Sequence, residues 1–243
     1  NFKEPLTEDR LFGWHGALFP TARSGMQKIV VGQWRDNKPE DPMQVVSGAM
    51  GREKVHFQAP DAEVLEKEMT AFLAWFNQKE ETNPIIKAAI AHLWFVTIHP
   101  FDDGNGRIAR TIADMQLARA DGIPKRFYSM SAQIRIERKE YYNILEKTQH
   151  GTTNITEWLI WFLECLNRSL IASEENLATV INKAKFWEGI KSIPLNDRQI
   201  KMINKLMDGF TGKLTSSKWA KISKCSPDTA LRDIQDLIIK GVL

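Results

Sequence analysis

The segment HPFDDGNGRIAR, residues 99–110, separates two strong helical patterns and sets how the chain passes between them. Before it, the run from 84 to 97 is apolar on nearly every side and starts with a proline, which suits a first helical turn. After it, a second helix is predicted from about Gly106 to just before Gly122. We therefore expect a buried central helix joined by a short glycine-containing loop to another core helix.

Apolar residues recur with a helical period over much of the remaining chain. Further helices are predicted over residues 6–19, 61–77, 131–149 and 156–182. Between the first two lies a stretch rich in glycine and proline, with short β-prone runs at 29–34, 44–47 and 54–57. The fold class is therefore mainly α: a helical bundle with one small β-hairpin, at about 43–58, and a C-terminal helical appendage.

The composition changes after Trp187, which predicts two domains, 1–187 and 188–243. The second reads as three short helices, and Ser226 with Pro227 forms a typical helix start. This pattern favours a helix-turn-helix of winged-helix type.

Composition indicates a globular protein of moderate charge. The 243 residues are 43% hydrophobic and 26% charged, with a net charge of +3. Cys165 and Cys225 stand alone, which argues against a disulfide framework or a zinc cage and favours a cytoplasmic location. The longest apolar run is too short and too polar to cross a bilayer, so no membrane partner is expected.

The loop between the two central helices has the parts of a phosphate site. Gly104 and Gly106 let the backbone approach a ligand closely, and the following helix N-terminus favours an anion. Arg107 and Arg110 share a helix face, and two guanidinium groups suit a di- or triphosphate. Asp103 is the expected Mg²⁺ ligand beside such phosphates. His99 can take a proton at neutral pH. Phe101 is expected to anchor the loop in the core.

Residues 99–110 match the signature HxFx(D/E)GNGRxxR of the Fic family at every specified position, and the chain resembles bacterial Fic proteins that end in a winged helix. The resemblance implies transfer of AMP from ATP to a Tyr, Thr or Ser hydroxyl of a target protein, with release of pyrophosphate. It implies that His99 is the base and Asp103 the Mg²⁺ ligand. The phosphate binders would be Gly104, Asn105, Gly106, Arg107 and Arg110.

Two further site assignments follow from the same resemblance. The hairpin strand Gln44, Val45, Val46 and Ser47 is similar to the flap that holds a target segment by strand addition. Tyr142 and Gln149 fall where some members line the adenine site. Neither His56 nor the other histidines outside the motif have a motif context, so we interpret them as packing or surface residues.

Many Fic proteins carry an inhibitory helix with the motif (S/T)xxxE(G/N), which this chain lacks. Glu188-Gly189 has Ala184 where Ser or Thr is required. The expectation is that such a helix precedes this chain, which would then be a released, more active form.

Other functions stay open at this point. The chain is alternatively a DNA-binding regulator with a nucleotide-sensing core, because a basic stretch lacks acids from residue 212 to 225, with Lys213, Lys218, Lys221 and Lys224. The helix after it carries Asp228, Asp233 and Asp236, which would repel DNA. The same motif also fits removal of AMP, or transfer of another phosphate-containing group. Self-modification and a homodimer are open as well.

Overall fold

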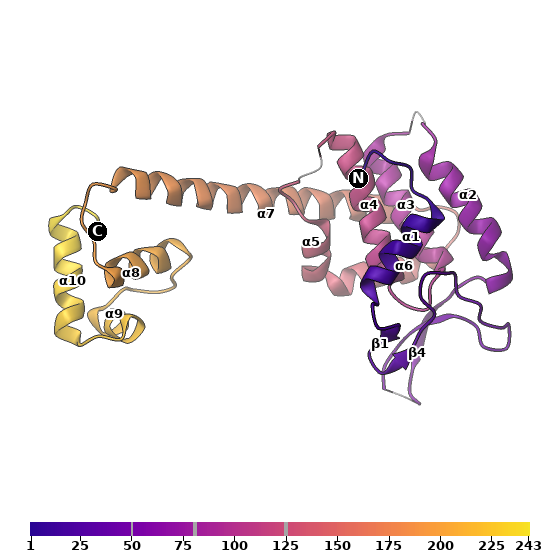
Figure 1. Ribbon diagram of the computed structural model, residues 1–243, viewed down its shortest axis with the longest axis horizontal. Coiled ribbons are helices and arrows are strands. Elements are labelled where there is room, and N and C mark those ends of the chain that lie inside the picture. Colours follow the sequence, from indigo (N-terminus) through magenta and orange to yellow (C-terminus); the bar gives the residue numbers. More distant parts are fainter. Residues whose placement is uncertain (50, 80–81, 124–125) are drawn as a thin grey trace. The chain divides into compact units, whose positions relative to one another are not determined.

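The computed structural model describes residues 1–49, 51–79, 82–123 and 126–243. These residues divide into two compact units, Asn1–Ala172 and Ser173–Leu243 (Figure 1). The division lies within one long helix, α7 (Thr156–Gly189), whereas composition places the domain boundary after Trp187. The domain assignment 1–187 and 188–243 stays a prediction.

The first unit is mainly helical, as predicted. Its elements in chain order are α1 (Glu8–Leu18), β1 (Arg23–Ser24), β2 (Gln27–Lys28), β3 (Gln44–Ser47), β4 (Lys54–Gln58), η1 (Ala62–Val64), α2 (Leu65–Asn77), α3 (Pro84–Ile98), α4 (Asn105–Asp121), α5 (Met130–Ile136), α6 (Arg138–Gln149) and the first part of α7.

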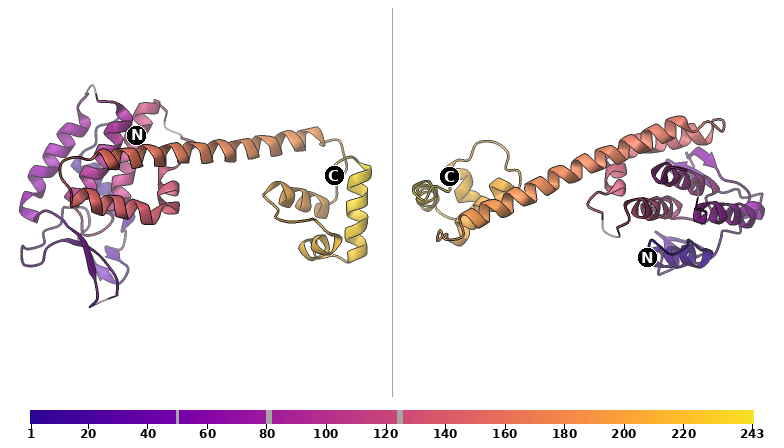
Figure 2. Two further views of the ribbon diagram at one scale, coloured as in Figure 1. Left: turned by 180° about the vertical axis from the view of Figure 1, so that it is seen from behind. Right: turned by 90° about the horizontal axis from the view of Figure 1, so that it is seen from above.

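Helix α3 is the buried centre of this unit. The Asn83 side chain caps it by accepting hydrogen bonds from the backbone N–H groups of Ile85 and Ile86. Its side chains are buried on several faces, as its uniform apolarity predicts. It packs along α4, as Figure 2 shows, and Trp158 of α7 donates a hydrogen bond to the Ala89 carbonyl at 2.9 Å. The two helices flanking the 99–110 segment therefore lie against each other.

The predicted strand at 29–34 is absent, which corrects the sequence prediction. In its place the short strands β1 and β2 pair with each other just before it. The backbone of 29–34 bonds to distant groups: Val30 N–H donates to the Asp102 carboxylate at 2.8 Å, and Gly32 N–H to His15 Nδ1 at 3.4 Å. Donors used in this way are not available for a β-ladder.

The helix predicted over 131–149 is two helices, α5 and α6, which meet at Glu137. This residue has φ −94° and ψ 26°, outside the helical range. Its carboxylate accepts two hydrogen bonds from Arg168 of α7, at 2.6 and 2.7 Å. A charge-assisted bidentate pair of this kind favours the break at this point.

The predicted hairpin is present as β3 and β4, which pair antiparallel with an irregular register. Val45 lies opposite Phe57 and Val46 opposite Val55, so His56 is an extra residue in β4. This is a β-bulge, and bulges redirect side chains. Met50, inside the predicted flap, lies outside the described residues.

The second unit contains the end of α7 and three short helices, α8 (Asp197–Met207), α9 (Ser216–Ser223) and α10 (Pro227–Ile239). The Ser226 side chain caps α10, as predicted. Residues 173–243 are all described, and no strand occurs among them, so the winged-helix assignment stays a prediction. Asp233 is 5% exposed and pairs with Arg198 at 2.8 Å, so this carboxylate packs within the unit. DNA binding stays a prediction.

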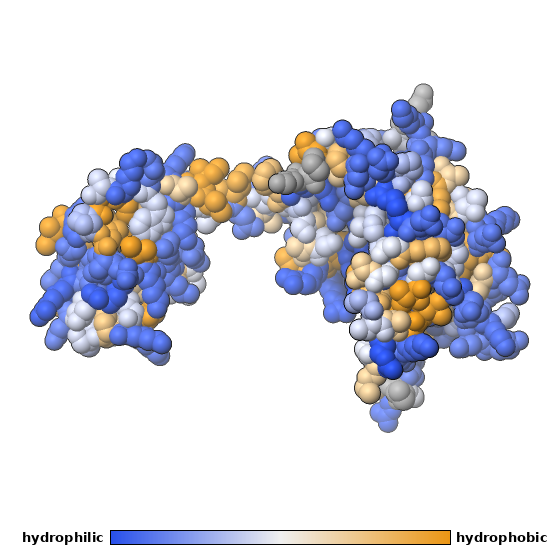
Figure 3. Space-filling view, viewed as in Figure 1, coloured by the Kyte–Doolittle hydropathy of each residue, from blue (hydrophilic) through white to orange (hydrophobic). Residues whose placement is uncertain are grey.

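Helix α7 exposes apolar side chains, which Figure 3 shows as orange atoms along it. Ile171 in the first unit is 48% exposed, and Val180 in the second is 63% exposed. Exposed apolar patches mark contact surfaces, but nothing identifies a partner, and the homodimer stays a prediction. No helix in the described ranges has both the length and the apolar character that a bilayer crossing requires.

The expectation that Phe101 anchors the loop is confirmed. Its side chain is fully buried, stacked on His15 at a ring-centroid distance of 4.1 Å and tilted against Trp34 at 5.0 Å. Phe101→Ala should lower the free energy of unfolding of the first unit by about 3–5 kcal/mol, because it leaves a cavity in a packed core. Chemical denaturation followed by near-UV circular dichroism measures this change.

Met26→Ala is the matched control, because Met26 is 94% exposed in the same unit. Its effect should stay within about 0.5 kcal/mol. Equal effects of the two substitutions would show that Phe101 does not anchor the loop.

Candidate active site

The segment 99–105 turns sharply between α3 and α4. His99 ends α3 with a left-handed backbone, at φ 53° and ψ 55°. Gly104 precedes α4 with φ 85°, and a Cβ atom built there would lie 2.9 Å from Phe19 Cε2. The turn directs the N-terminus of α4, with its free N–H groups, toward the loop, which favours an anion there.

Arg35 stabilises the loop through hydrogen bonds to its backbone carbonyls. Its side chain is 3% exposed, and its Nε donates to the His99 carbonyl at 2.8 Å. Its backbone N–H donates to the Pro100 carbonyl at 2.9 Å. Burial lowers the pKa of this guanidinium, and the Asp102 carboxylate opposes that effect. The C-terminal end of α3 favours a cation, so Arg35 fixes the position of His99.

The His99 imidazole is arranged as a base. Its Nδ1 lies 3.0 Å from the Val96 carbonyl, which only accepts, so Nδ1 carries the proton and Nε2 keeps its lone pair. Burial is the main cause that lowers the pKa of His99 below its ordinary value, with Arg35 acting in the same direction. The ring is therefore neutral at pH 7 and able to accept a proton.

The Asn105 side chain forms hydrogen bonds within the loop. It is 1% exposed, its Oδ1 accepts from Phe101 N–H at 2.9 Å, and its Nδ2 donates to the Phe101 carbonyl at 2.7 Å. These contacts close the turn that places His99 and α4 side by side. The predicted contact of Asn105 with phosphate stays a prediction.

Asp103 and Arg107 lie together at the loop. Arg107 Nη2 is 3.6 Å from an Asp103 carboxylate oxygen, and both side chains are 45% exposed. The Ser24 hydroxyl donates to the same carboxylate, and the Arg107 guanidinium packs over the Phe19 ring. His15 Nε2 lies 3.1 Å from the Asp103 carbonyl and so holds its backbone.

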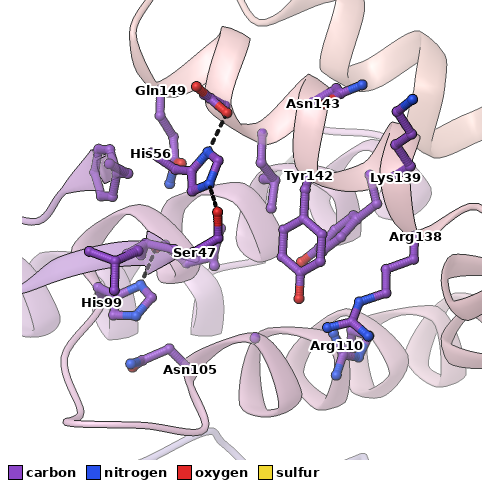
Figure 4. Close-up of a pocket in the computed structure, with 18 of the residues that line it drawn as sticks. Ser47, His56, His99, Asn105, Arg110, Arg138, Lys139, Tyr142, Asn143 and Gln149 are labelled. Carbon is purple, nitrogen blue, oxygen red and sulfur yellow. Dashed lines mark hydrogen bonds and ion pairs between the residues drawn. The ribbon is translucent and has the colours of Figure 1, made fainter. Parts of the chain in front are cut away.

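A cavity of about 560 Å³ opens beside this loop (Figure 4). This volume is in the range of small-molecule sites. Of the predicted residues, the lining includes Val45, Val46, Ser47, His99, Asp103, Asn105, Gly106, Arg110, Tyr142 and Gln149. Gln44, Gly104 and Arg107 are not among the lining residues, although Arg107 contacts Asp103, which is.

Two buried aromatic side chains, His92 and Tyr141, lie near Arg110 at the cavity. His92 Nε2 lies 2.9 Å from the Tyr141 hydroxyl, and both side chains are almost fully buried. Burial lowers the pKa of His92 to about 3, and the nearby Arg110 charge contributes. Burial also raises the pKa of Tyr141. Both rings are therefore neutral beside the Arg110 charge.

Tyr142 and Gln149 come from α6. Tyr142 is 48% exposed, and its ring points from α6 into the cavity in Figure 4. The Arg138 guanidinium lies over this ring at 5.6 Å, and Gln149 Nε2 donates to Thr97 Oγ1 at 3.2 Å. The structure thus brings both predicted adenine-site residues to the cavity that contains His99. Their binding role stays a prediction.

The sequence analysis missed several residues of this cavity, chiefly His56 and, from α6, Arg138, Lys139, Asn143 and Glu146. The interpretation of His56 as a packing or surface residue stays a prediction, but its side chain lines the cavity and bonds to Glu146 at 2.6 Å. The two residues are 90 positions apart, so no local motif could reveal the pair.

The cavity offers one protein carboxylate for a metal ion, and not a complete set of protein ligands. In the ranges that the structure describes, no cluster of three His, Cys, Asp or Glu side chains is arranged to hold an ion. Magnesium in nucleotide sites takes one or two carboxylates and completes its shell with phosphate and water. The half-exposed Asp103 carboxylate at the cavity meets that requirement, whereas a dedicated protein cage does not exist there.

Comparison with known proteins gives consistent results. A model of the Fic/DOC family matches residues 5–117. The chain is 37% identical over 115 residues to a protein adenylyltransferase Fic of Nematostella vectensis, covering 46% of this chain and 25% of that protein. It is 34% identical over 104 residues to one of Aedes aegypti, covering 42% and 19%. The chain thus spans a quarter or less of these curated relatives.

Solved structures are similar in fold. A Fic family protein from Desulfovibrio desulfuricans matches with a TM-score of 0.54 and 20% identity, over 96% of this chain and 62% of that one. A Fic domain containing signaling protein from Bacteroides thetaiotaomicron matches with a TM-score of 0.53 and 25% identity, over 76% and 65%.

The loop geometry generates a stability prediction at Gly104. Gly104→Ala should destabilise the first unit by more than about 1–2 kcal/mol, because a left-handed backbone costs that much and the new methyl group meets Phe19. Urea denaturation measures the loss.

Gly13→Ala in α1 is the control, since a Cβ there meets no atom within 4 Å. Alanine in a helix is favoured over glycine by about 0.5–1 kcal/mol, so this variant should be as stable as the wild type or more so. A tolerated Gly104→Ala would refute the described turn.

Proposed function

We propose, from the match of residues 5–117 to the Fic/DOC family model, that the protein is a protein adenylyltransferase, which moves AMP from ATP to a Tyr, Thr or Ser hydroxyl of a target protein. The observation that carries the proposal is the neutral imidazole of His99, half-buried at one side of a cavity that also contains Arg110 and the N-terminus of α4. The resemblance to protein adenylyltransferases of other organisms supports it.

The phosphates of ATP bind at the start of α4. The backbone N–H of Gly106, the helix dipole and Arg110 supply positive potential, and Arg107 lies next to the loop. Asp103 would hold Mg²⁺ together with phosphate oxygens, and the bound ion would neutralise phosphate charge. Tyr142 and Gln149 receive the adenine.

His99 acts on the acceptor. Its Nε2 takes the proton of the incoming hydroxyl, whose oxygen forms a bond to the α-phosphorus of ATP, while the bond to pyrophosphate breaks. Because Nδ1–H donates to the Val96 carbonyl, the lone pair is fixed on Nε2. A positioned general base contributes about 10²–10⁴-fold in rate.

The target enters along β3. Within the described residues this strand pairs only with β4, so its other edge is free to accept an extended segment of the target. Val45, Val46 and Ser47 line the cavity, and Gln44 begins the strand beside them, so a segment bound here brings its side chain toward His99.

His99→Ala should lower kcat for AMP incorporation from labelled ATP about 10²–10⁴-fold, because the base is lost. The dissociation constant for ATP should change little, since phosphate binding rests on other groups. Gel autoradiography and calorimetric titration measure the two effects. Label that persists unchanged in His99→Ala would defeat the base assignment.

The site also predicts a pH dependence. The pKa of His99 lies below its ordinary value of 6.5, so the basic form is present above that lowered pKa and is lost only as the pH falls through it. The acid limb of kcat/KM for transfer should therefore have its midpoint below pH 6.5. A midpoint at or above 6.5 that vanishes in His99→Ala would contradict the environment described for this residue.

The same pocket also fits removal of AMP from a modified protein, in which water breaks the bond between the phosphorus and the protein oxygen. Incubation of the protein with an AMP-modified target in the absence of ATP distinguishes AMP transfer from AMP removal. If the protein releases AMP from this target but does not incorporate AMP from ATP into an unmodified one, AMP removal replaces the transferase assignment.

A further inference from the structure

The side chains of Ser47, His56 and Glu146 form a hydrogen-bonded triad at one wall of the cavity. The Ser47 hydroxyl lies 2.6 Å from His56 Nε2, and His56 Nδ1 lies 2.6 Å from a Glu146 carboxylate oxygen. Figure 4 shows the dashed line from His56 to Ser47, with His99 on the far side of Ser47. The function proposed above uses β3 through its backbone edge, so it gives this side-chain arrangement no part.

Further contacts fix the positions of His56 and Glu146. His56 is the extra residue of the bulge in β4, and its own carbonyl lies 2.7 Å from His150 Nε2. Lys54 binds the second oxygen of Glu146 at 3.0 Å. Hydrogen bonds from His56 and Lys54 lower the pKa of Glu146, so this group is a carboxylate at neutral pH.

The chemistry of the partners fixes the direction of the bonds. A carboxylate only accepts, so His56 Nδ1 carries the hydrogen and donates it to Glu146. In the neutral ring Nε2 has the lone pair and accepts from the Ser47 hydroxyl. An imidazole oriented by a carboxylate and bonded to a serine hydroxyl is the arrangement that activates serine as a nucleophile in hydrolases.

The geometry points to Ser47 as an acceptor of AMP within this chain, with His56 as its base and Glu146 as the residue that orients His56. This inference rests on the proposed function, because the donor is the same ATP. Ser47 Oγ forms a bond to the α-phosphorus, the bond to pyrophosphate breaks, and the hydroxyl proton passes to His56 Nε2. Ser47 and His56 line the same cavity as Gly106 and Arg110, where the phosphates bind.

The first test is a map of self-modification. The protein is incubated with ATP and Mg²⁺, digested, and analysed by mass spectrometry for a gain of one AMP. We expect AMP on Ser47, its loss in Ser47→Ala, and a rate lowered about 10²-fold in His56→Gln and less severely in Glu146→Gln. Ser217→Ala, an exposed serine of the second unit, is the control and should keep the modification.

A second test needs no ATP. A fluorophosphonate reagent, which labels activated serines, should react with Ser47 in the wild type and far more slowly in His56→Gln. Circular dichroism of each variant establishes that it is folded.

The outcomes separate the two proposals. AMP found only at other residues, or equal modification of Ser47 in wild type and His56→Gln, overturns this inference and leaves the transferase intact. If no AMP is incorporated anywhere, on this chain or on other proteins, the proposed function fails and the acceptor role of Ser47 fails with it. Reaction with the fluorophosphonate would in that case assign the activated serine to a different substrate.

Discussion

The site depends on one buried cation at the end of one helix. Taking a guanidinium out of water is costly unless its donors are paired, and Arg35 uses its side chain and its backbone on the carbonyls of His99 and Pro100. Those carbonyls lie where α3 ends, at the negative end of its dipole. The interaction therefore fixes the turn, and through the turn it fixes the imidazole and the start of α4.

The long-range parts of this support were beyond sequence analysis. The motif, the helices that flank it, the cap at Ser226, and the anchor Phe101 are local features, and each was predictable from neighbouring residues. The segment 29–34 reads as a strand because its residues are β-prone. Its backbone instead bonds to His15 and Asp102, and that of the next residue, Arg35, bonds to Pro100, partners that no periodicity reveals.

The candidate site divides in the same way. The loop residues and the two α6 residues assigned by resemblance lie at one cavity, except that Arg107 and Gly104 are not among its lining residues. The pair of His56 and Glu146 joins a hairpin to a helix far along the chain, and it depends on a bulge that a regular strand pattern does not encode. The site thus combines one readable motif with tertiary contacts that only coordinates reveal.

The left-handed backbone of His99 limits which residues can replace it. Few residue types accept φ near 53° without a penalty: glycine does, and asparagine, aspartate and histidine are enriched there. Of these only histidine also offers a neutral nitrogen lone pair at physiological pH. The position is thus constrained twice, by backbone conformation and by proton affinity. In related chains that have lost the activity, histidine at this position should be replaced by asparagine or glycine more often than by alanine or glutamine.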